Sequence, residues 1–241
     1  MTDEEIIQKL KITPKTKVLD MGGSLKQHPE ISVDTLVDMY PPEIAPYWPS
    51  KLLAKHFVKA DIMRQNLPFK DKEFDVVLCT HVVEDLFNPF LILEEMSRVA
   101  KKGLIVTPTR GKDMEFSGFN LTDWKTGPRR QPGHSHHHWF IENLDNKLIL
   151  TPKIYPLLYT REFQVTKWKG EEECQYFWEG KINYEVFGQV DTHALIENYR
   201  QFMRANKDIL ETGAILFYVD NPFRVLREVG KRCYQLLSSH F

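Results

Sequence analysis

The 241-residue sequence lacks the features of several specialised protein classes. Its formal net charge is −1, so it has no overall basic excess that would hold nucleic acid through phosphate contacts. Its three cysteines are scattered, with the spacing of neither a disulfide framework nor a metal site, which suits a reducing compartment. No apolar run approaches the roughly 20 residues of a membrane helix, and the acidic start lacks the order of a signal peptide. We therefore expect a cytoplasmic globular protein with no membrane or nucleic-acid partner.

The first distinctive stretch is residues 17–24, KVLDMGGS, in which an apolar run ends in Asp20 and two glycines follow. This order predicts a buried strand that opens into a tight turn, over which a ligand can lie close to the backbone. In open α/β sheets, nucleotides bind at such a turn, at the carboxyl end of the first strand. Asp20, Gly22, Gly23 and Ser24 are therefore candidate cofactor-binding residues. The alternative is an ordinary strand followed by a glycine turn.

A second strand, predicted over residues 35–38, also ends in a carboxylate, Asp38, which lies 18 residues after Asp20. An acidic residue at this place offers two acceptor oxygens to the two hydroxyls of a ribose. A solvated carboxylate at a strand end is the alternative. A third strand over residues 57–61 ends in Asp61.

Strands and helices alternate through the first part of the chain. Thr2 is a candidate N-cap, with Glu5 three residues later, for a helix that runs to about Leu10. Buried strands are expected over residues 76–79 and 104–107, and a helix from residue 89 to about 100 is expected to end at a Gly103 C-cap. The alternation predicts an α/β protein with a doubly wound, mostly parallel, Rossmann-like sheet.

The pattern changes after Pro108, where residues 110–133 form a polar loop with little periodicity. Beyond it we expect a strand over 148–151, antiparallel strands over 165–168 and 174–186, and helices over 191–210 and 222–237. These elements predict a C-terminal α+β elaboration. Residues 1–110 would form the nucleotide-binding core, and residues 111–241 would complete the same domain with an acceptor-binding loop, antiparallel strands and helices.

Residues 134–139, HSHHHW, contain an unusual group of histidines. In an extended conformation His134, His136 and His138 share one face, and His137 points away. Neutral imidazoles can serve as a general base or hold a substrate, and three of them could instead hold a zinc-like ion. A solvated loop is the third possibility.

Two further positions are candidates for the chemistry. His81 follows the strand over 76–79 and would face the same cleft as the first glycine turn, either as a base or as a packed histidine under the cofactor. Arg110 begins a locally basic loop that also contains Lys112, and a basic loop suits an anionic acceptor as well as solvent.

Several blocks in order make the first 110 residues resemble the class I S-adenosylmethionine-dependent methyltransferases, specifically their type 11 methyltransferase domain. The blocks are Val18–Gly23, Thr35–Asp38, Ala60–Asp61 followed by Leu67–Phe69 and Phe74–Val77, Thr80–Asp85, and Met96–Lys101. The resemblance implies S-adenosylmethionine as cofactor, with Asp61 and its neighbour Ile62 on the adenine side and Thr80 at the site.

The chain also departs from the family pattern. The third glycine of the cofactor loop is missing, and a short connection with His28-Pro29 replaces the full helix. The family's Glu-His pair is replaced by Glu84-Asp85. A subgroup of the family has a similar His-Pro connection and a later His-x-Trp block, which His137 and Trp139 resemble.

Together these features predict a methyltransferase that acts on an oxygen of a small acceptor, with a nitrogen as the second candidate. His137 or His81 would be the general base, and His134, His136, His138, Trp139 and Arg110 would bind the acceptor. The subgroup resemblance points to a sugar or glycan precursor. Two alternatives stay open: a methyltransferase-like binding or regulatory subunit without turnover, and a metal-dependent enzyme centred on His134–His138.

Overall fold

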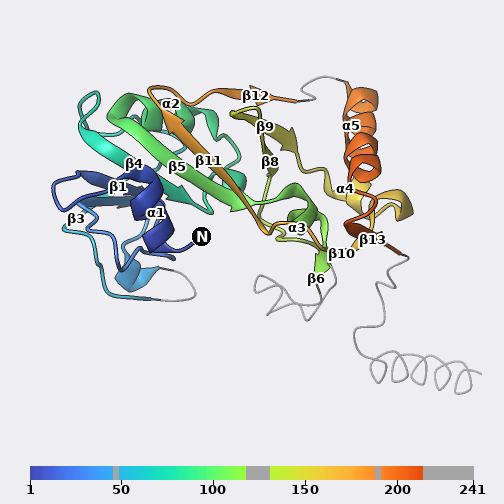
Figure 1. Ribbon diagram of the computed structural model, residues 1–241, viewed down its shortest axis with the longest axis horizontal. Helices are drawn as coiled ribbons and strands as arrows, with labels where there is room; N and C mark the ends of the chain where they lie inside the picture. Colours follow the sequence, from blue (N-terminus) through green and yellow to red (C-terminus); the bar gives the residue numbers. More distant parts are fainter. Residues whose placement is uncertain (46–48, 118–130, 188–190, 214–241) are drawn as a thin grey trace, which may run out of the picture. The chain divides into compact units, whose positions relative to one another are not determined.

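The computed structural model describes residues 1–45, 49–117, 131–187 and 191–213 (Figure 1). Two compact units make up the chain. The first contains Met1–Lys112, His136–Ile154 and Glu171–Leu195, and the second contains Asp113–Ser135, Tyr155–Gly170 and the described residues from Ile196 onward. The helix expected over 222–237 lies outside the described residues. Among those residues, no helix combines the length and apolar character that crossing a membrane requires.

The first unit is built on a six-stranded sheet with the strand order β11-β5-β4-β1-β2-β3. Its strands are β1 Val18–Met21, β2 Thr35–Asp38, β3 His56–Lys59, β4 Phe74–Thr80, β5 Ala100–Pro108 and β11 Glu173–Glu179. The first five are parallel to one another, and β11 joins β5 in antiparallel orientation. This mostly parallel sheet confirms the predicted Rossmann-like fold.

The two faces of this sheet bury alternate residues of the same strands. Val18 of β1 packs with Ile6 and Leu10 of helix α1, Asp3–Leu10. The next residue, Leu19, packs in a larger cluster with helix α2, Phe90–Val99. This alternation is the period-two pattern of a strand that is covered on both faces. Helix α1 also has the predicted capping box, in which the side chains of Thr2 and Glu5 each accept from the other's backbone N–H.

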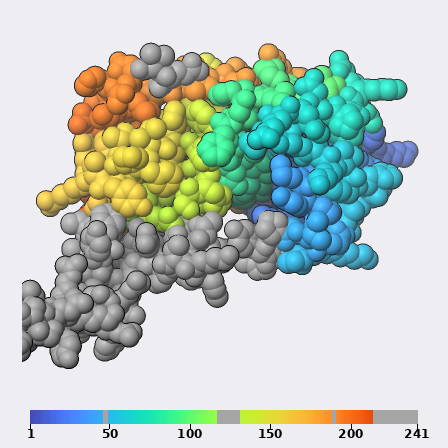
Figure 2. Space-filling view, turned by 180° about the vertical axis from the view of Figure 1, so that it is seen from behind, coloured from blue at the N-terminus to red at the C-terminus, as the bar shows by residue number. Residues whose placement is uncertain are grey.

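A second, three-stranded sheet covers the α2 face of the first unit. It consists of β8 Trp139–Leu144, β9 Lys147–Pro152 and β12 Tyr184–Val186, in the order β12-β9-β8. Ile141, Leu148 and Leu150 extend from it into the larger cluster. Figure 2 shows the first unit from behind, where the residues up to about β5, coloured blue to green, form a continuous body.

The strand expected over 165–168 exists, whereas the strand expected over 174–186 is divided into β11 and β12, which belong to different sheets. The strands over 165–168 and 173–179 are not partners of each other. Strand β10, Val165–Trp168, pairs with β13, Leu210–Thr212, in the second unit. Strand β11 pairs instead with β5, where Tyr176 and Trp178 are buried in the larger cluster. The antiparallel pairing was therefore predicted wrongly, because a sequence pattern does not reveal which edge a strand completes.

Helix α2 ends at Val99, within a residue of the predicted end, but Gly103 is not its C-cap. Gly103 lies within β5, where a Cβ would come 2.4 Å from the carbonyl oxygen of Val77. The end of α2 is stabilised by Lys72, whose Nζ donates to the carbonyl oxygens of Ser97 at 2.6 Å and Ala100 at 2.9 Å. Lys72, in the turn before β4, thus donates to carbonyl groups at the end of α2 that have no partner within the helix, as the backbone of a glycine cap would otherwise do.

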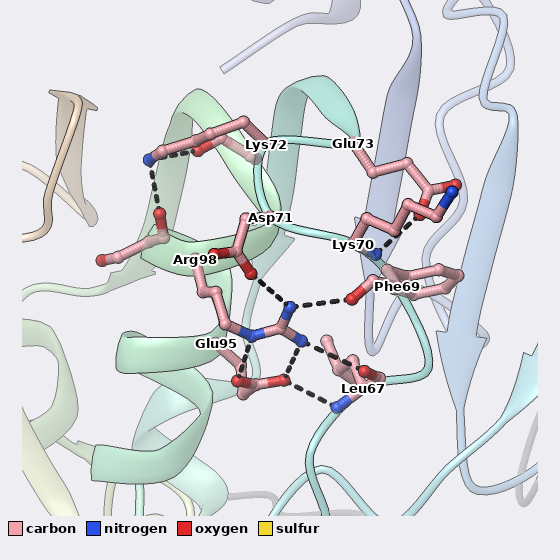
Figure 3. A network of polar contacts seen from close by, with 10 residues as sticks. Leu67, Phe69, Lys70, Asp71, Lys72, Glu73, Glu95 and Arg98 are labelled. Atoms are coloured by element: carbon pink, nitrogen blue, oxygen red, sulfur yellow. Dashed lines mark hydrogen bonds and ion pairs between the residues drawn. The ribbon is translucent and has the colours of Figure 1, made fainter.

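An Arg98 network anchors the loop before β4 to α2 (Figure 3). The guanidinium donates to the Glu95 carboxylate at 2.7 and 2.8 Å, and to the carbonyl oxygens of Phe69 and Leu67 at 2.7 and 3.1 Å. Glu95 in turn accepts from the Leu67 N–H at 2.6 Å. Because Arg98 and Glu95 satisfy polar groups of the backbone of this loop, the network stabilises the fold.

The second unit is smaller in its described part. It contains β6 Phe116–Ser117, β7 Gln131–Pro132, α4 Tyr155–Leu158, the 3-10 turn Arg161–Phe163, β10 and β13, while α3 Arg110–Met114 and α5 Thr192–Ala205 each run across the division between the units. Phe163 packs edge-to-face on Tyr199, with ring centroids 5.6 Å apart. The long loop expected over 110–133 is thus partly structured at both ends. Its basic residues Lys125, Arg129 and Arg130 lie outside the described residues.

Candidate functional site

The turn after β1 needs both of its glycines. Gly22 has φ +75°, and a Cβ there would come 2.5 Å from a methyl carbon of Val82. A Cβ on Gly23 would come 2.0 Å from Oδ2 of Asp20. These approaches exclude any side chain, so the turn brings bare backbone and the Asp20 carboxylate together at the carboxyl edge of the sheet.

Asp20 is almost fully buried, at 1% exposure. Within the described residues, neither of its carboxylate oxygens has a hydrogen-bond partner. Burial, followed by the charges of Asp38 and Asp3, raises the pKa of this carboxyl to about 8. A buried carboxyl without a partner is costly as an anion, and a positively charged ligand group nearby would stabilise the ionised form.

Asp38, at the end of β2, organises the next part of the site. Its Oδ1 accepts from the Met39 N–H at 2.6 Å, and its Oδ2 accepts from the Ser24 N–H at 3.2 Å. The Ser24 hydroxyl donates to the carbonyl oxygen of Tyr40 at 2.5 Å. These bonds join the turn after β1 to the turn after β2, so the two predicted ligand-binding turns form one wall.

A pocket with a volume of about 220 Å³ lies along this wall. It is lined by Gly22, Ser24, Leu25, Asp38, Met39, Tyr40, Ala45, Ala60, Asp61, Ile62, Met63, His81, Val82, Asp85 and Leu86. Asp61 turns back on its own loop, where its Oδ1 accepts from the Met63 N–H at 3.1 Å. The pocket therefore combines the carboxylates of Asp38, Asp61 and Asp85 with apolar side chains, which is the composition of a site for a small organic ligand.

His81 follows β4 with φ +55° and lines this pocket. Its Nδ1 lies 3.3 Å from Oε1 of Glu84, and its Nε2 lies 3.4 Å from Oε1 of Glu173. Desolvation lowers the pKa of His81, but the hydrogen bond and charge of Glu84 outweigh it, so the net shift is upward. An imidazole held between two carboxylates is a strong base with a fixed orientation.

The histidines of residues 134–138 do not form the expected extended segment. Residues 135 and 136 form a turn, which breaks the alternation that would place His134, His136 and His138 on one face. His137 is 5% exposed, and its Nε2 lies 3.4 Å from Oδ1 of Asp85. His136 Nε2 lies 3.5 Å from the same oxygen. The turn, rather than a strand, therefore directs two imidazoles to one carboxylate of the pocket wall.

The other predicted acceptor-binding residues lie away from the pocket. His138 stacks on Phe87 with ring centroids 3.8 Å apart, and burial lowers the pKa of His138 with help from the charges of His137 and Lys153. Trp139 donates from Nε1 to the carbonyl oxygen of Leu86 at 2.9 Å. His134 belongs to the second unit.

Arg110 and Thr80 are both buried, at 2% and 8% exposure. The Nη1 of Arg110 lies 3.2 Å from the Glu142 carboxylate, and its guanidinium lies over the Phe140 ring. Thr80 faces a different cavity from the one along the glycine turn. Of the predicted site residues, six line this one pocket: Gly22, Ser24, Asp38, Asp61, Ile62 and His81. Asp20 of β1 and Gly23 of the glycine turn do not line the pocket. The remaining predicted residues of the first unit are also absent from its lining: Thr80, Arg110, His136, His137, His138 and Trp139.

Sequence reasoning missed two of the groups that act on His81. Glu84 is buried at 1% exposure, and it comes from the 3-10 turn Val83–Asp85 that follows β4. Glu173 comes from the antiparallel strand β11, 92 residues away along the chain. Its only sequence signal was an acidic run, Glu171–Glu173, at the start of an apolar strand.

The sequence model of a family described as "Methyltransferase domain" matches residues 35–107, the segment from β2 into β5. Residues 35–107 are therefore similar to a methyltransferase domain. The cofactor of that family is S-adenosylmethionine, and the matched segment contributes β2 to β5 of the mostly parallel six-stranded sheet of the first unit.

Individual relatives match only in part. An uncharacterised protein of Methanocaldococcus jannaschii is 42% identical over 55 residues, which are 22% of this chain and 27% of that protein. The chain thus spans about a quarter of the length of this curated relative. Among solved structures, a methyltransferase from Aquifex aeolicus is 20% identical with a TM-score of 0.36, covering 49% of this chain and 68% of its own. The YcgJ protein from Bacillus subtilis is 19% identical with a TM-score of 0.33, covering 44% and 50%.

Proposed function

We propose that this protein transfers a methyl group from S-adenosylmethionine to an oxygen of a small acceptor, with a nitrogen as the second candidate atom. The observation that carries the proposal is the buried carboxylate of Asp20, which has no hydrogen-bond partner among the described residues and lies behind a turn of two obligatory glycines. When bound, the cofactor supplies an electrophilic methyl group on a positively charged sulfur.

The residues of the pocket fit this cofactor. Asp20 provides a buried negative charge for its cationic methionine part, and Gly22 and Gly23 provide bare backbone beside it. Asp38 provides carboxylate oxygens for the ribose hydroxyls, while Asp61 and Ile62 line the remaining part of the pocket on the adenine side.

His81 is the better placed of the two candidate bases, because it lines the pocket itself and His137 does not. Its imidazole would take the proton that an acceptor hydroxyl loses during methylation. In the neutral ring Nδ1–H would donate to Glu84, which leaves the lone pair of Nε2 to take the proton, and Glu84 and Glu173 would both stabilise the imidazolium that results. His137 would instead help to position Asp85, which lines the pocket and lies within ion-pair distance of both His136 and His137.

The proposed acceptor is a small, sugar-like molecule. A hydroxyl acceptor needs a general base, and the ring held between Glu84 and Glu173 is arranged to act as one. The family subgroup with a similar His-Pro connection points to the same acceptor class, by analogy of sequence.

Calorimetric titration with S-adenosylhomocysteine tests the proposal directly. We expect micromolar binding, and we expect Asp38→Ala to weaken it at least tenfold, which corresponds to about 1.4 kcal/mol. Asp208→Ala, the same change at an exposed position of the second unit, is the matched control and should bind normally. Thermal melting of both variants separates lost binding from lost folding.

Absence of heat and of thermal stabilisation at millimolar ligand would refute the cofactor assignment. Binding without turnover on any acceptor would instead favour the alternative of a non-catalytic binding subunit. Replacing His81 by Asn separates the two, because Asn tolerates φ +55° and should preserve cofactor binding while removing the base.

A further inference from the structure

A second cavity, with a volume of about 460 Å³, lies next to the cofactor pocket in the first unit. Its wall is formed by the start of α1, by residues 26–30 and by the carboxyl ends of β4 and β5 together with the start of β11. We call it the acidic cavity, and its polar lining includes Asp3, Lys26, His28, Glu30, Thr80 and Glu173. A cavity of this size is in the range of sites for small molecules.

The acidic cavity shares a wall with the cofactor pocket. Thr80 lines the acidic cavity, and the next residue, His81, lines the cofactor pocket. On the other side of the turn, Leu25 lines the cofactor pocket and Lys26 lines the acidic cavity. Glu173 of the acidic cavity contacts Nε2 of His81 at 3.4 Å. The candidate base therefore lies between the two spaces, where an acceptor and a methyl donor must meet.

Two buried polar atoms belong to residues that line the acidic cavity and have no hydrogen-bond partner among the described residues. They are Nε2 of His28, a residue with 5% exposure, and Oγ1 of Thr80, with 8% exposure. Nδ1 of His28 lies 2.7 Å from Oδ1 of Asp3, so this nitrogen carries a proton that it donates to the carboxylate. Buried polar atoms are normally satisfied, and ligand hydroxyl groups, which can both donate and accept, would suit both of these atoms.

The charges on the wall favour a ligand of one sign. Four of the lining side chains are carboxylates, including Asp3, Glu30 and Glu173, whereas Lys26 and the amino group of Met1 are the cationic groups of the lining. Glu173 already contacts the Met1 amino group at 2.7 Å and lies 4.0 Å from Lys26. The surplus of carboxylates disfavours an anionic ligand and favours one with a positive charge.

We propose that the acidic cavity binds the methyl acceptor and that this acceptor is a small molecule with several hydroxyl groups and a protonated amine. The proposal rests on the function proposed above and names its substrate class. Hydroxyl and ammonium hydrogens match the acceptor-rich wall around His28, Thr80 and Glu173. This class differs from the anionic acceptor that the basic loop at Arg110 suggested.

Three sugars with rings of equal size but with different charges test the acceptor class. The full chain, saturated with S-adenosylhomocysteine, is titrated with D-glucosamine, D-glucose and D-glucuronate, and amide shifts are followed by NMR at a pH that keeps the amine protonated. We expect glucosamine to shift the signals of His28, Thr80 and Glu173 at millimolar concentration, and glucuronate to leave them unchanged. Tighter binding of glucuronate, or shifts confined to other residues, would overturn the proposal.

Two variants make the result specific to the cavity. Thr80→Val replaces an unpartnered hydroxyl by a methyl group of the same size, and Glu173→Gln removes one negative charge. Each should weaken glucosamine binding at least about threefold, while the exposed neighbour Glu172→Gln should not. Absence of shifts at Gly22 and Asp38 on addition of S-adenosylhomocysteine would instead signal failure of the cofactor proposal, so the two failures are distinguishable.

Discussion

Because Asp20 is buried and its pKa is raised, we predict that cofactor binding releases a proton. With a pKa raised to about 8, about nine in ten free molecules carry the Asp20 proton at pH 7. A cationic cofactor group next to this carboxyl favours the ionised form and lowers its pKa in the complex. Binding at pH 7 should therefore expel up to one proton for each cofactor bound.

The same linkage sets the pH dependence of affinity. Below about pH 8 the proton and the cofactor compete for Asp20, so the affinity should rise close to tenfold, about 1.4 kcal/mol, for each unit of pH. Above about pH 8 the carboxyl is already ionised, and the affinity should become constant. Folding without ligand shows the opposite trend. The proton is bound more tightly in the folded state, so its stabilising contribution is full below the ordinary pKa of 3.8 and lost as the pH rises toward 8.

Calorimetry in buffers of different ionisation enthalpy measures the number of protons released. Asp20→Asn keeps the shape of the side chain but cannot titrate, so its binding should release no proton at this site and lose its pH dependence between pH 6 and about pH 8. Asp208→Asn is the control and should behave like the native chain. Binding by the native chain without proton release, at an affinity independent of pH, would refute the assignment of Asp20 to the cationic part of the cofactor.

Three further predictions concern neighbouring parts of the structure. Gly23→Ala should abolish cofactor binding and lower the melting temperature, because the new Cβ would lie 2.0 Å from Oδ2 of Asp20. Arg98→Gln should destabilise the fold by about 2–3 kcal/mol in urea unfolding, because it leaves the buried Glu95 network without its cation. Glu84→Gln should shift the rising limb of the pH–rate profile to lower pH, because Glu84 raises the pKa of His81 and the neutral ring is the active base.

Each of these variants has a matched control. Gly213→Ala adds the same methyl group where its nearest neighbour is a Thr166 methyl carbon at 3.2 Å. Arg204→Gln removes an exposed cation from an exposed pair, which should change stability by no more than about 0.5 kcal/mol. Glu197→Gln should leave the pH profile unchanged. If a test variant and its control changed cofactor binding, stability or the pH profile equally, the local contact would not be the cause of the change.

Local sequence patterns were enough to predict most of the first unit. The strand over Thr35–Asp38 has the predicted bounds, and the capping box at Thr2 forms as the sequence indicates. Alternating burial and strand–helix order depend only on neighbours along the chain, so they can be recognised from composition and spacing. The glycine turn could also be predicted from local sequence, because only glycine is compatible with its close contacts.

Patterns were least informative where the partner of a group is distant along the chain. Nothing near Gly103 indicated that β5 continues through it, because the constraint is the Val77 carbonyl oxygen on the next strand. Likewise, the basic loop at Arg110 suggested an exposed cation, whereas the fold buries this side chain against Glu142 and Phe140. Burial of a charged residue depends on whether a partner is present in space.

The sequence by itself determined the parallel sheet, the turn after Asp20 and the carboxylate of Asp38, because strand period, glycine geometry and strand-end chemistry are local properties. Only the tertiary structure decided the surroundings of His81. It brought Glu173 of β11 to one side of that imidazole and Glu84 to the other, and it placed the acidic cavity against the cofactor pocket. Long-range contacts of this kind follow from which sheet edge a strand completes, and that choice is made by packing of the whole unit.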